Sequence, residues 1–100
     1  MPTVYVTAPP EDADDLAQSL VEERLAACVN LVDCHSTYWW DGEVVNEDES
    51  ILLVKTTAEG YDELRRRIET LHPHDVPCIE RFDETHVLDS YAEWVSAEVE

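Results

Sequence analysis

Two long β-forming runs on either side of a tight turn constrain this fold more than any other feature of the sequence. Residues 28–40 are rich in β-branched and aromatic side chains, Asp41-Gly42 is a strong turn signal, and a second run covers 43–56. Arms of about 12 residues at about 3.3 Å each predict a hairpin of roughly 40 Å. A domain of this length has a radius of gyration of only about 13 Å, so part of the hairpin must project beyond the body.

The composition of the hairpin predicts how it is covered. Residues 51–54 are apolar at every position, which predicts burial on both faces of the return strand. Residues 46–49 are all polar and predict a bulge or a frayed edge. Tyr38, Trp39 and Trp40 would lie on the projecting part. Exposed aromatic strands aggregate unless a partner covers them, so the sequence predicts oligomerisation.

A strand and an amphipathic helix are predicted before the hairpin. Residues Thr3–Thr7 alternate apolar and polar side chains and stop at Ala8-Pro9-Pro10, which predicts a short strand and a turn. A helix should follow, because acidic residues fill its first turn and apolar residues recur at steps of three and four: Ala13, Leu16, Ala17, Leu20, Val21 and Leu25.

A second helix, a fourth strand and a terminal helix are predicted after the hairpin. Thr56 with Glu59 could form a capping box, and His72-Pro73 ends a helix whose apolar stripe is Tyr61, Leu64, Ile68 and Leu71. Residues 76–82 predict a strand, and a short amphipathic C-terminal helix contains Tyr91, Trp94, Val95 and Val99. The order βαββαβ plus a helix predicts one α+β, ferredoxin-like domain spanning residues 1–100.

The charge of the chain is strongly acidic, with 24 Asp and Glu residues against 6 Lys and Arg. Raising salt from about 0.15 M to about 1 M shortens the screening length from roughly 8 Å to roughly 3 Å. Adaptation to a salty, halophilic cytoplasm is therefore the simplest interpretation. An acidic partner-binding face is the alternative, but the carboxylates are spread from Glu11 to Glu100.

Several function classes lack their sequence signals. The only basic cluster, Arg65–Arg67, is explained by helical ion pairs with Asp62 and Glu63, so no nucleic-acid partner is expected. The sequence has neither an apolar run of about 18 residues nor a charged-then-apolar leader, so neither a membrane span nor export is expected. Two glycines exclude the usual phosphate loops, and no elbow motif surrounds a Ser or Cys, so no enzyme is predicted.

The densest set of metal-ligand residue types is His72, His74 and Cys78. Imidazole and thiolate together suit copper or zinc. The alternative is structural: His72 caps the helix, His74 is exposed and Cys78 is a small apolar strand residue. Because this spacing is not a specific metal pattern, spacing alone favours the structural alternative.

Two further residues have a distinctive context. Cys28 lies at a helix-to-strand junction, where a buried packing role is expected rather than a metal-binding one. Lys55 is the only lysine and follows a buried apolar run. It could serve a charge role or simply pair with a nearby carboxylate. The odd count of three cysteines, without a CxxC spacing, fits a reducing cytoplasm.

Five ordered motifs, covering nearly the whole chain, resemble the CutA divalent-cation tolerance proteins. The motifs are Glu23–Asn30, Ser36-x-Tyr38-x-Trp40-x-Gly42, Lys55-Thr56, His72-Pro73 with Pro77, and Tyr91-x-x-Trp94. The resemblance implies a ferredoxin-like subunit similar in architecture to PII signalling proteins. It also implies a tight homotrimer with paired hairpins, an association with divalent metals and copper, and no enzymatic reaction.

The resemblance assigns roles by position. Lys55, Trp40, Tyr91 and Trp94 match residues expected near the cleft between subunits, and His72 and Cys28 match residues considered for metal binding. Two positions depart from the family pattern. His74 stands where Tyr is usual, and Cys78 stands where Glu is usual, so both changes add soft ligand capacity while Cys78 removes a carboxylate.

Two hypotheses follow from these residues. The first is a trimeric cytoplasmic protein of metal tolerance that binds copper or another divalent cation through His72, His74 and Cys78, with Cys28 as a further candidate. The second is a signalling or scaffold module of the PII type, which binds a small ligand or a protein partner in the cleft between subunits.

Overall fold

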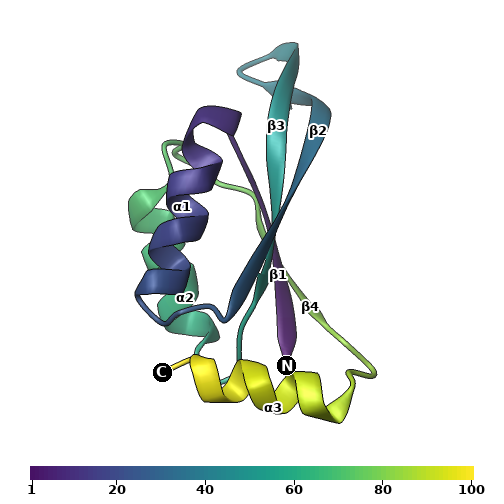
Figure 1. Cartoon of the computed structure of the whole chain (residues 1–100). Coiled ribbons are helices and arrows are strands. Elements are labelled where there is room, and N and C mark those ends of the chain that lie inside the picture. The colour runs from purple at the N-terminus through teal and green to yellow at the C-terminus, as the bar shows by residue number, and fades with distance from the viewer.

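The computed structural model describes all 100 residues as a four-stranded antiparallel sheet with α1 and α2 on one face and α3 across one end (Figure 1). The strand order is β2-β3-β1-β4. The predicted α+β order, βαββαβ with a terminal helix, is confirmed. The elements are β1 (Pro2–Ala8), α1 (Pro10–Glu22), β2 (Cys28–Trp40), β3 (Glu43–Lys55), α2 (Tyr61–Leu71), β4 (Ile79–Asp83) and α3 (Asp89–Glu98).

The hairpin of β2 and β3 is the longest feature of the molecule. Its register runs without a break from Cys28 opposite Lys55 to Trp40 opposite Glu43. Positive φ angles of 51° at Asp41 and 80° at Gly42 agree with the tight hairpin turn that this dipeptide favours. The molecule measures 45 × 26 × 21 Å, and the hairpin projects well beyond the helices, as the sequence predicts (Figure 1).

The predicted bulge or frayed edge at residues 46–49 is wrong, because these residues pair in register with β2. Their polar side chains have partners across the strands. The Thr37 hydroxyl donates to Asn46 Oδ1 at 2.7 Å, and His35 Nδ1 lies 2.7 Å from Asp48 Oδ1. Cross-strand pairs of this kind stabilise a ladder, so a polar run in an exposed hairpin need not interrupt it.

The core lies between one face of the sheet and the two helices α1 and α2. Alternate residues of β1 and β3 point toward the helices and are buried, including Val4, Val6, Leu52 and Val54. They pack with helix residues that are likewise buried: Ala13, Leu16, Leu20, Leu64 and Ile68. The period of two along the strands matches the stripe along each helix.

The opposite side of the sheet, called the open face here, is not covered by α1 or α2 (Figure 1). Ile51 and Leu53 point to this side and are only partly buried. The prediction that residues 51–54 are buried on both faces is therefore wrong for the single chain. Helices cover one face, and no second layer covers the other.

Helix α1 ends earlier than its apolar pattern predicts. Leu25 lies beyond the helix, and its N–H donates to the carbonyl oxygen of Leu20 at 3.0 Å. Arg24 has a φ of 62°, in the left-handed region that often terminates helices. Val21 is exposed, so it lies outside the buried stripe. Leu25 nevertheless belongs to the hydrophobic core, because the turn after α1 directs its side chain toward the other core residues.

The start of α2 differs from the predicted capping box. The Thr56 side chain is fully buried, and its hydroxyl donates to the carbonyl oxygen of Leu25 at 2.9 Å. The helix begins after Gly60, whose N–H donates to the Thr57 hydroxyl at 3.0 Å. Thr56 therefore joins the loop after α1 to the end of β3, and it does not cap a helix.

The arginines of α2 form ion pairs, but not with the expected partners. Arg67 contacts Glu23 through two nitrogens at 2.8 and 3.1 Å, and Arg65 contacts Glu69 at 3.0 Å. The predicted ion pairs with Asp62 and Glu63 are therefore wrong. The bidentate contact instead holds the end of α1 against α2.

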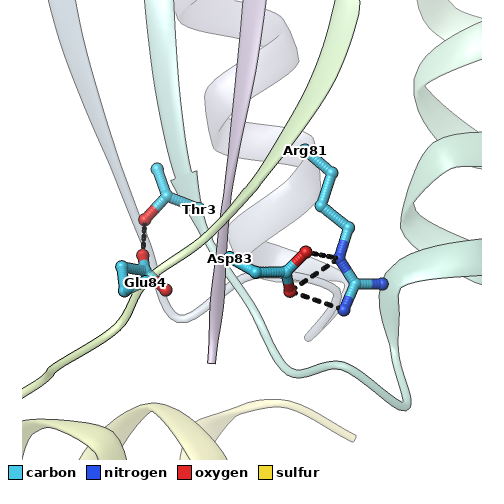
Figure 2. A network of polar contacts seen from close by, with 4 residues as sticks. All are labelled: Thr3, Arg81, Asp83 and Glu84. Atoms are coloured by element: carbon cyan, nitrogen blue, oxygen red, sulfur yellow. Dashed lines mark hydrogen bonds and ion pairs between the residues drawn. The ribbon is translucent and has the colours of Figure 1, made fainter.

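Strand β4 is shorter than predicted and is fixed at its exposed end. It begins at Ile79, and Val76 is 71% exposed. Figure 2 shows the Thr3 hydroxyl donating to the Glu84 carboxylate, beside a two-nitrogen contact between Arg81 and Asp83 at 2.8 and 3.0 Å. The Thr3–Glu84 hydrogen bond joins β1 to the residue after β4, whereas the Arg81–Asp83 contact lies within β4 itself.

Helix α3 crosses the end of the sheet opposite the hairpin tip (Figure 1). Of the residues predicted to form its apolar stripe, only Val95 is fully buried, whereas Trp94 is 44% exposed. The predicted amphipathic helix is present, but its two aromatic side chains, Tyr91 and Trp94, stay partly exposed in the single chain. None of the three helices has the length and apolar character needed to cross a membrane.

Candidate functional site

His72, the first of the predicted metal ligands, is bonded through both ring nitrogens. Its side chain is 7% exposed and lies at the end of α2. Nε2 lies 2.7 Å from the carbonyl oxygen of Thr7, and Nδ1 accepts the N–H of His74 at 3.1 Å. A nitrogen binds a metal through a free lone pair, so His72 must give up one of these bonds to become a ligand.

His74 and Cys78 lie close to His72 and are more accessible. The ring of His74 is exposed, with its centroid 5.0 Å from that of His72. Cys78 is half-buried, and its Sγ donates to Glu80 Oε2 at 3.5 Å. Burial raises the pKa of the Cys78 thiol. Three or more His, Cys, Asp or Glu side chains do not converge anywhere in the chain as a preformed metal centre.

The base of the hairpin brings together Cys28 and most of the predicted cleft residues. Cys28 is directly opposite Lys55, whose ammonium donates to Asn30 Oδ1 at 2.9 Å. Burial, together with the neighbouring Cys28, raises the pKa of Tyr91, and the ring of Tyr91 lies 5.7 Å from that of Trp94. Lys55 thus pairs with an amide and not with a carboxylate.

Trp40, the fourth predicted cleft residue, lies far from the other three. It is opposite Glu43 at the hairpin tip, whereas Lys55 is at the base. The 12 steps along β3 between their levels correspond to roughly 40 Å at about 3.3 Å per residue. The single chain therefore does not assemble the predicted cleft.

A hollow of about 710 Å³ on the open face brings Trp40 together with two of the predicted metal ligands, His74 and Cys78. It lies between the hairpin, β1 and the chain segment that leads from α2 into β4. We call it the open-face hollow. It is also lined by Tyr5, Tyr38, Glu47, Glu49, Asp75 and Glu80.

Three carboxylates of the hollow are functional candidates that sequence reasoning missed. Glu49 is only 7% exposed, and Glu47 accepts a hydrogen bond from the Tyr38 hydroxyl, which raises the pKa of Tyr38 to about 12. Glu80 lies across the hollow on β4. Side chains two residues apart on a strand point to the same face, so the alternation along β3 could have revealed from the sequence that Glu47 and Glu49 lie on one face.

Comparison with known proteins gives one consistent result. The family model described as "CutA1 divalent ion tolerance protein" matches residues 2–98. The divalent-cation tolerance protein CutA of Pyrococcus horikoshii is 40% identical over 96 residues, covering 95% of this chain and 94% of that protein. Its counterpart in Thermus thermophilus is 45% identical over 94 residues, covering 92% of this chain and 91% of that protein.

Solved structures agree with the sequence matches. The PII-like protein CutA from Nostoc sp. PCC 7120, in its apo form, superimposes with a TM-score of 0.97 at 36% identity, covering 100% of this chain and 98% of that one. A protein from Archaeoglobus fulgidus, described as the periplasmic divalent cation tolerance protein CutA, has a TM-score of 0.95 at 34% identity, with all of both chains covered.

Proposed function

Because the chain belongs to the CutA1 divalent ion tolerance family, we propose that it is a homotrimeric, cytoplasmic protein that binds copper or another divalent cation in metal tolerance. The proposal assigns it no enzymatic reaction, and its relatives are named for tolerance to divalent cations. The observation that carries the metal assignment is the position of His74 and Cys78, an imidazole and a thiol on one accessible hollow.

The four candidate ligands differ in accessibility and in whether they lie at the hollow. His74 and Cys78 are accessible and come first, and His72 can join them only by releasing the N–H of His74 or the carbonyl of Thr7. Cys28 lies at the base of the hairpin beside Tyr91, away from the hollow. Any metal bound by Cys28 would therefore occupy a site separate from the hollow.

Copper titration of matched variants tests this site. Cu(II) and Cu(I) are titrated at multimolar salt into the wild type, into His74→Ala/Cys78→Ser and into His86→Ala, an exposed histidine in the loop after β4. The double variant should lose the tightest binding, and His86→Ala should keep it. Equal affinity in all three proteins would reject the site. Binding that disappears as ionic strength rises would instead identify adventitious uptake by the acidic surface.

The homotrimer is proposed from surface that the single chain leaves uncovered. Trp39 is 73% exposed and Trp40 51% exposed on the projecting hairpin, and the open face has no second layer. Burial of such surface favours association of copies. Light scattering in high salt should give three times the 11.4 kDa chain mass, and a monomer at micromolar concentration would contradict the proposal.

The acidic surface is proposed to be an adaptation to a salty cytoplasm. The net charge of −18 is spread over the chain, and the single basic cluster, Arg65–Arg67, does not offset it. At molar salt the screening length falls to about 3 Å, which suppresses repulsion between neighbouring carboxylates.

A second candidate function is a PII-like module that binds a small ligand or protein between subunits. The observation that favours it is Lys55, whose ammonium has only an amide partner and lies at the end of the sheet where Tyr91 and Trp94 stack. Tryptophan fluorescence screened against metabolites, with Lys55→Ala as the control, tests this function. A flat response, together with a pull-down that recovers no partner, would count against it.

A further inference from the structure

Helix α3 has few attachments to the rest of the chain. Residues 85–87, which lead into the helix, form no backbone hydrogen bond, and only Val95 of the helix is fully buried. Just after the helix, Val99 lies beside Gly60, where an added Cβ would meet Val99 Cγ1 at 3.4 Å. An element with few buried contacts opens locally at low cost, so the position of α3 depends on the contacts at its C-terminal end.

Arg24 makes three contacts with this end of α3. Its guanidinium Nη1 donates to Glu98 Oε2 at 2.5 Å and lies 3.5 Å from the carbonyl oxygen of the same residue. The carbonyl oxygen of Arg24 accepts the N–H of Glu100 at 3.0 Å. A hydrogen bond between a guanidinium and a carboxylate is stronger than one between neutral groups, because both partners are charged. Arg24 therefore joins the turn after α1 to the C-terminal end of α3.

The backbone conformation of Arg24 indicates that the side chain serves this contact. Its φ of 62° lies in the left-handed region, where glycine is the residue favoured after a helix. An arginine at such a position has a steric cost that glycine avoids. The side chain is 51% exposed, so its own burial compensates for little of that cost. What the side chain adds is the contact with Glu98.

The turn that contains Arg24 also holds the base of the hairpin. The Ala27 N–H donates to the carbonyl oxygen of Lys55 at 2.9 Å, and the next residue, Cys28, is directly opposite Lys55 in the sheet. The side chain of Cys28 is in turn a neighbour of Tyr91 on α3. One short segment therefore connects the lysine of the candidate cleft with the helix that carries its aromatic residues.

We propose that Arg24 is a positioning residue for the cleft at the hairpin base, because it holds the end of α3 and thereby keeps Tyr91 and Trp94 in place. The proposal rests on the second candidate function, in which these aromatic residues and Lys55 bind a ligand between subunits. Arg24 does not contact the ligand. It fixes the helix on which the aromatic rings stand, and loss of its contact with Glu98 leaves that helix free to open.

Hydrogen exchange of the assembled protein, read by mass spectrometry of its peptides, tests the proposal with Arg24→Gly. Glycine relieves the left-handed φ while it removes the contact with Glu98, so the global stability and the attachment of α3 should change in opposite directions. Peptides of α3 should exchange about three- to tenfold faster, as expected for the loss of a charge-assisted contact. Peptides of α1 and β1 should keep their rates, and the urea midpoint should be unchanged or higher. Faster exchange throughout the chain with a lower midpoint would overturn the proposal.

Two further substitutions isolate the ion pair. Glu98→Ala should raise α3 exchange about threefold, and Arg24→Gly/Glu98→Ala should exchange no faster than Arg24→Gly alone, because both changes remove the same contact. Arg65→Ala is the control, since it removes an exposed ion pair on α2, and it should change α3 exchange less than about twofold. Additive effects in the double variant, wild-type α3 exchange in either single variant of the pair, or an equal rise in the control would overturn the proposal.

The environment of Trp94 gives a spectroscopic readout of its position. In protein labelled with fluorotryptophan, the fluorine resonance of Trp94 is identified by its absence from Trp94→Phe. Arg24→Gly should shift this resonance and leave that of Trp39, at the hairpin tip, unchanged. A resonance of Trp94 that does not move would show that Arg24 does not position this ring.

None of these measurements uses a ligand, so failure of this proposal is distinct from failure of the cleft function. If α3 opens as expected in Arg24→Gly but the metabolite screen of the wild type is flat, Arg24 positions α3 and the cleft function is wrong. If the screen finds a ligand but α3 of Arg24→Gly exchanges at the wild-type rate, the cleft function stands and the positioning role of Arg24 is wrong.

Discussion

Replacement of His72 by alanine tests whether this imidazole serves the fold. The side chain is 7% exposed and connects the end of α2 to the carbonyl oxygen of Thr7 at 2.7 Å and to the N–H of His74 at 3.1 Å. Loss of the partner of a buried polar group costs about 1–3 kcal/mol, and the vacated ring leaves a partial cavity. Water can replace the bond to the exposed His74, so we expect a total loss of about 2–4 kcal/mol.

Urea denaturation followed by circular dichroism measures this loss. Salt and protein concentration are held constant, and a lower midpoint with an unchanged slope indicates a change of stability alone. His74→Ala is the matched control, because its ring is exposed and should cost less than about 1 kcal/mol. A loss below about 0.5 kcal/mol for His72→Ala, or equal losses for both variants, would refute a structural role for His72.

Three further predictions concern other contacts. Thr56→Val should lower stability by about 1–2 kcal/mol in thermal unfolding, because the carbonyl of Leu25 loses its buried donor; an unchanged melting temperature would contradict this. The hydrogen bond to Glu47 raises the pKa of Tyr38 to about 12, so the bond should persist below about pH 10 and be lost as pH rises through about 12. Tyr38→Phe should accordingly remove the highest step of a tyrosinate absorbance titration. The trimer should loosen below about 0.5 M salt, because three chains of charge −18 repel as screening fails, and a salt-independent melting temperature would reject this.

The fold was largely predictable because its signals are local. Asp41-Gly42 is a turn dipeptide whose two residues have the positive φ angles that a tight hairpin needs, and the run at 28–40 becomes β2 with those bounds. The His72-Pro73 pair ends α2 because proline disfavours the helical conformation in the residue before it. Each of these features depends on residues adjacent in the chain.

The predictions that failed depend on partners distant in the chain. Thr56 has the local pattern of a helix cap, but its hydroxyl bonds to Leu25, which precedes it by 31 positions. Residues 46–49 have the composition of a frayed edge, but His35 and Thr37 on the opposite strand pair with them. Local propensity cannot identify such a partner, because the choice is made by the tertiary fold.

The candidate site was only partly predictable for the same reason. Strand parity alone could have placed Glu47 and Glu49 on one face, since residues two apart on a strand point the same way. Their position opposite Cys78 and Glu80 depends on how β1 separates β3 from β4 in the sheet. The order of the strands along the chain does not by itself show that β1 lies between β3 and β4 in the sheet.

The length of the hairpin decides where each proposed site can exist. Trp40 at the tip and Lys55 at the base are separated by roughly 40 Å at about 3.3 Å per residue, and Tyr91 lies with Lys55. A cleft that contains all three must take Trp40 from a second chain, so dissociation of the assembly should abolish it. The open-face hollow is lined entirely by one chain and needs no second copy to form. Dilution to low salt therefore separates the two proposed functions, because a cleft ligand should be released with the trimer, whereas copper held by His74 and Cys78 of one chain should remain bound to the monomer.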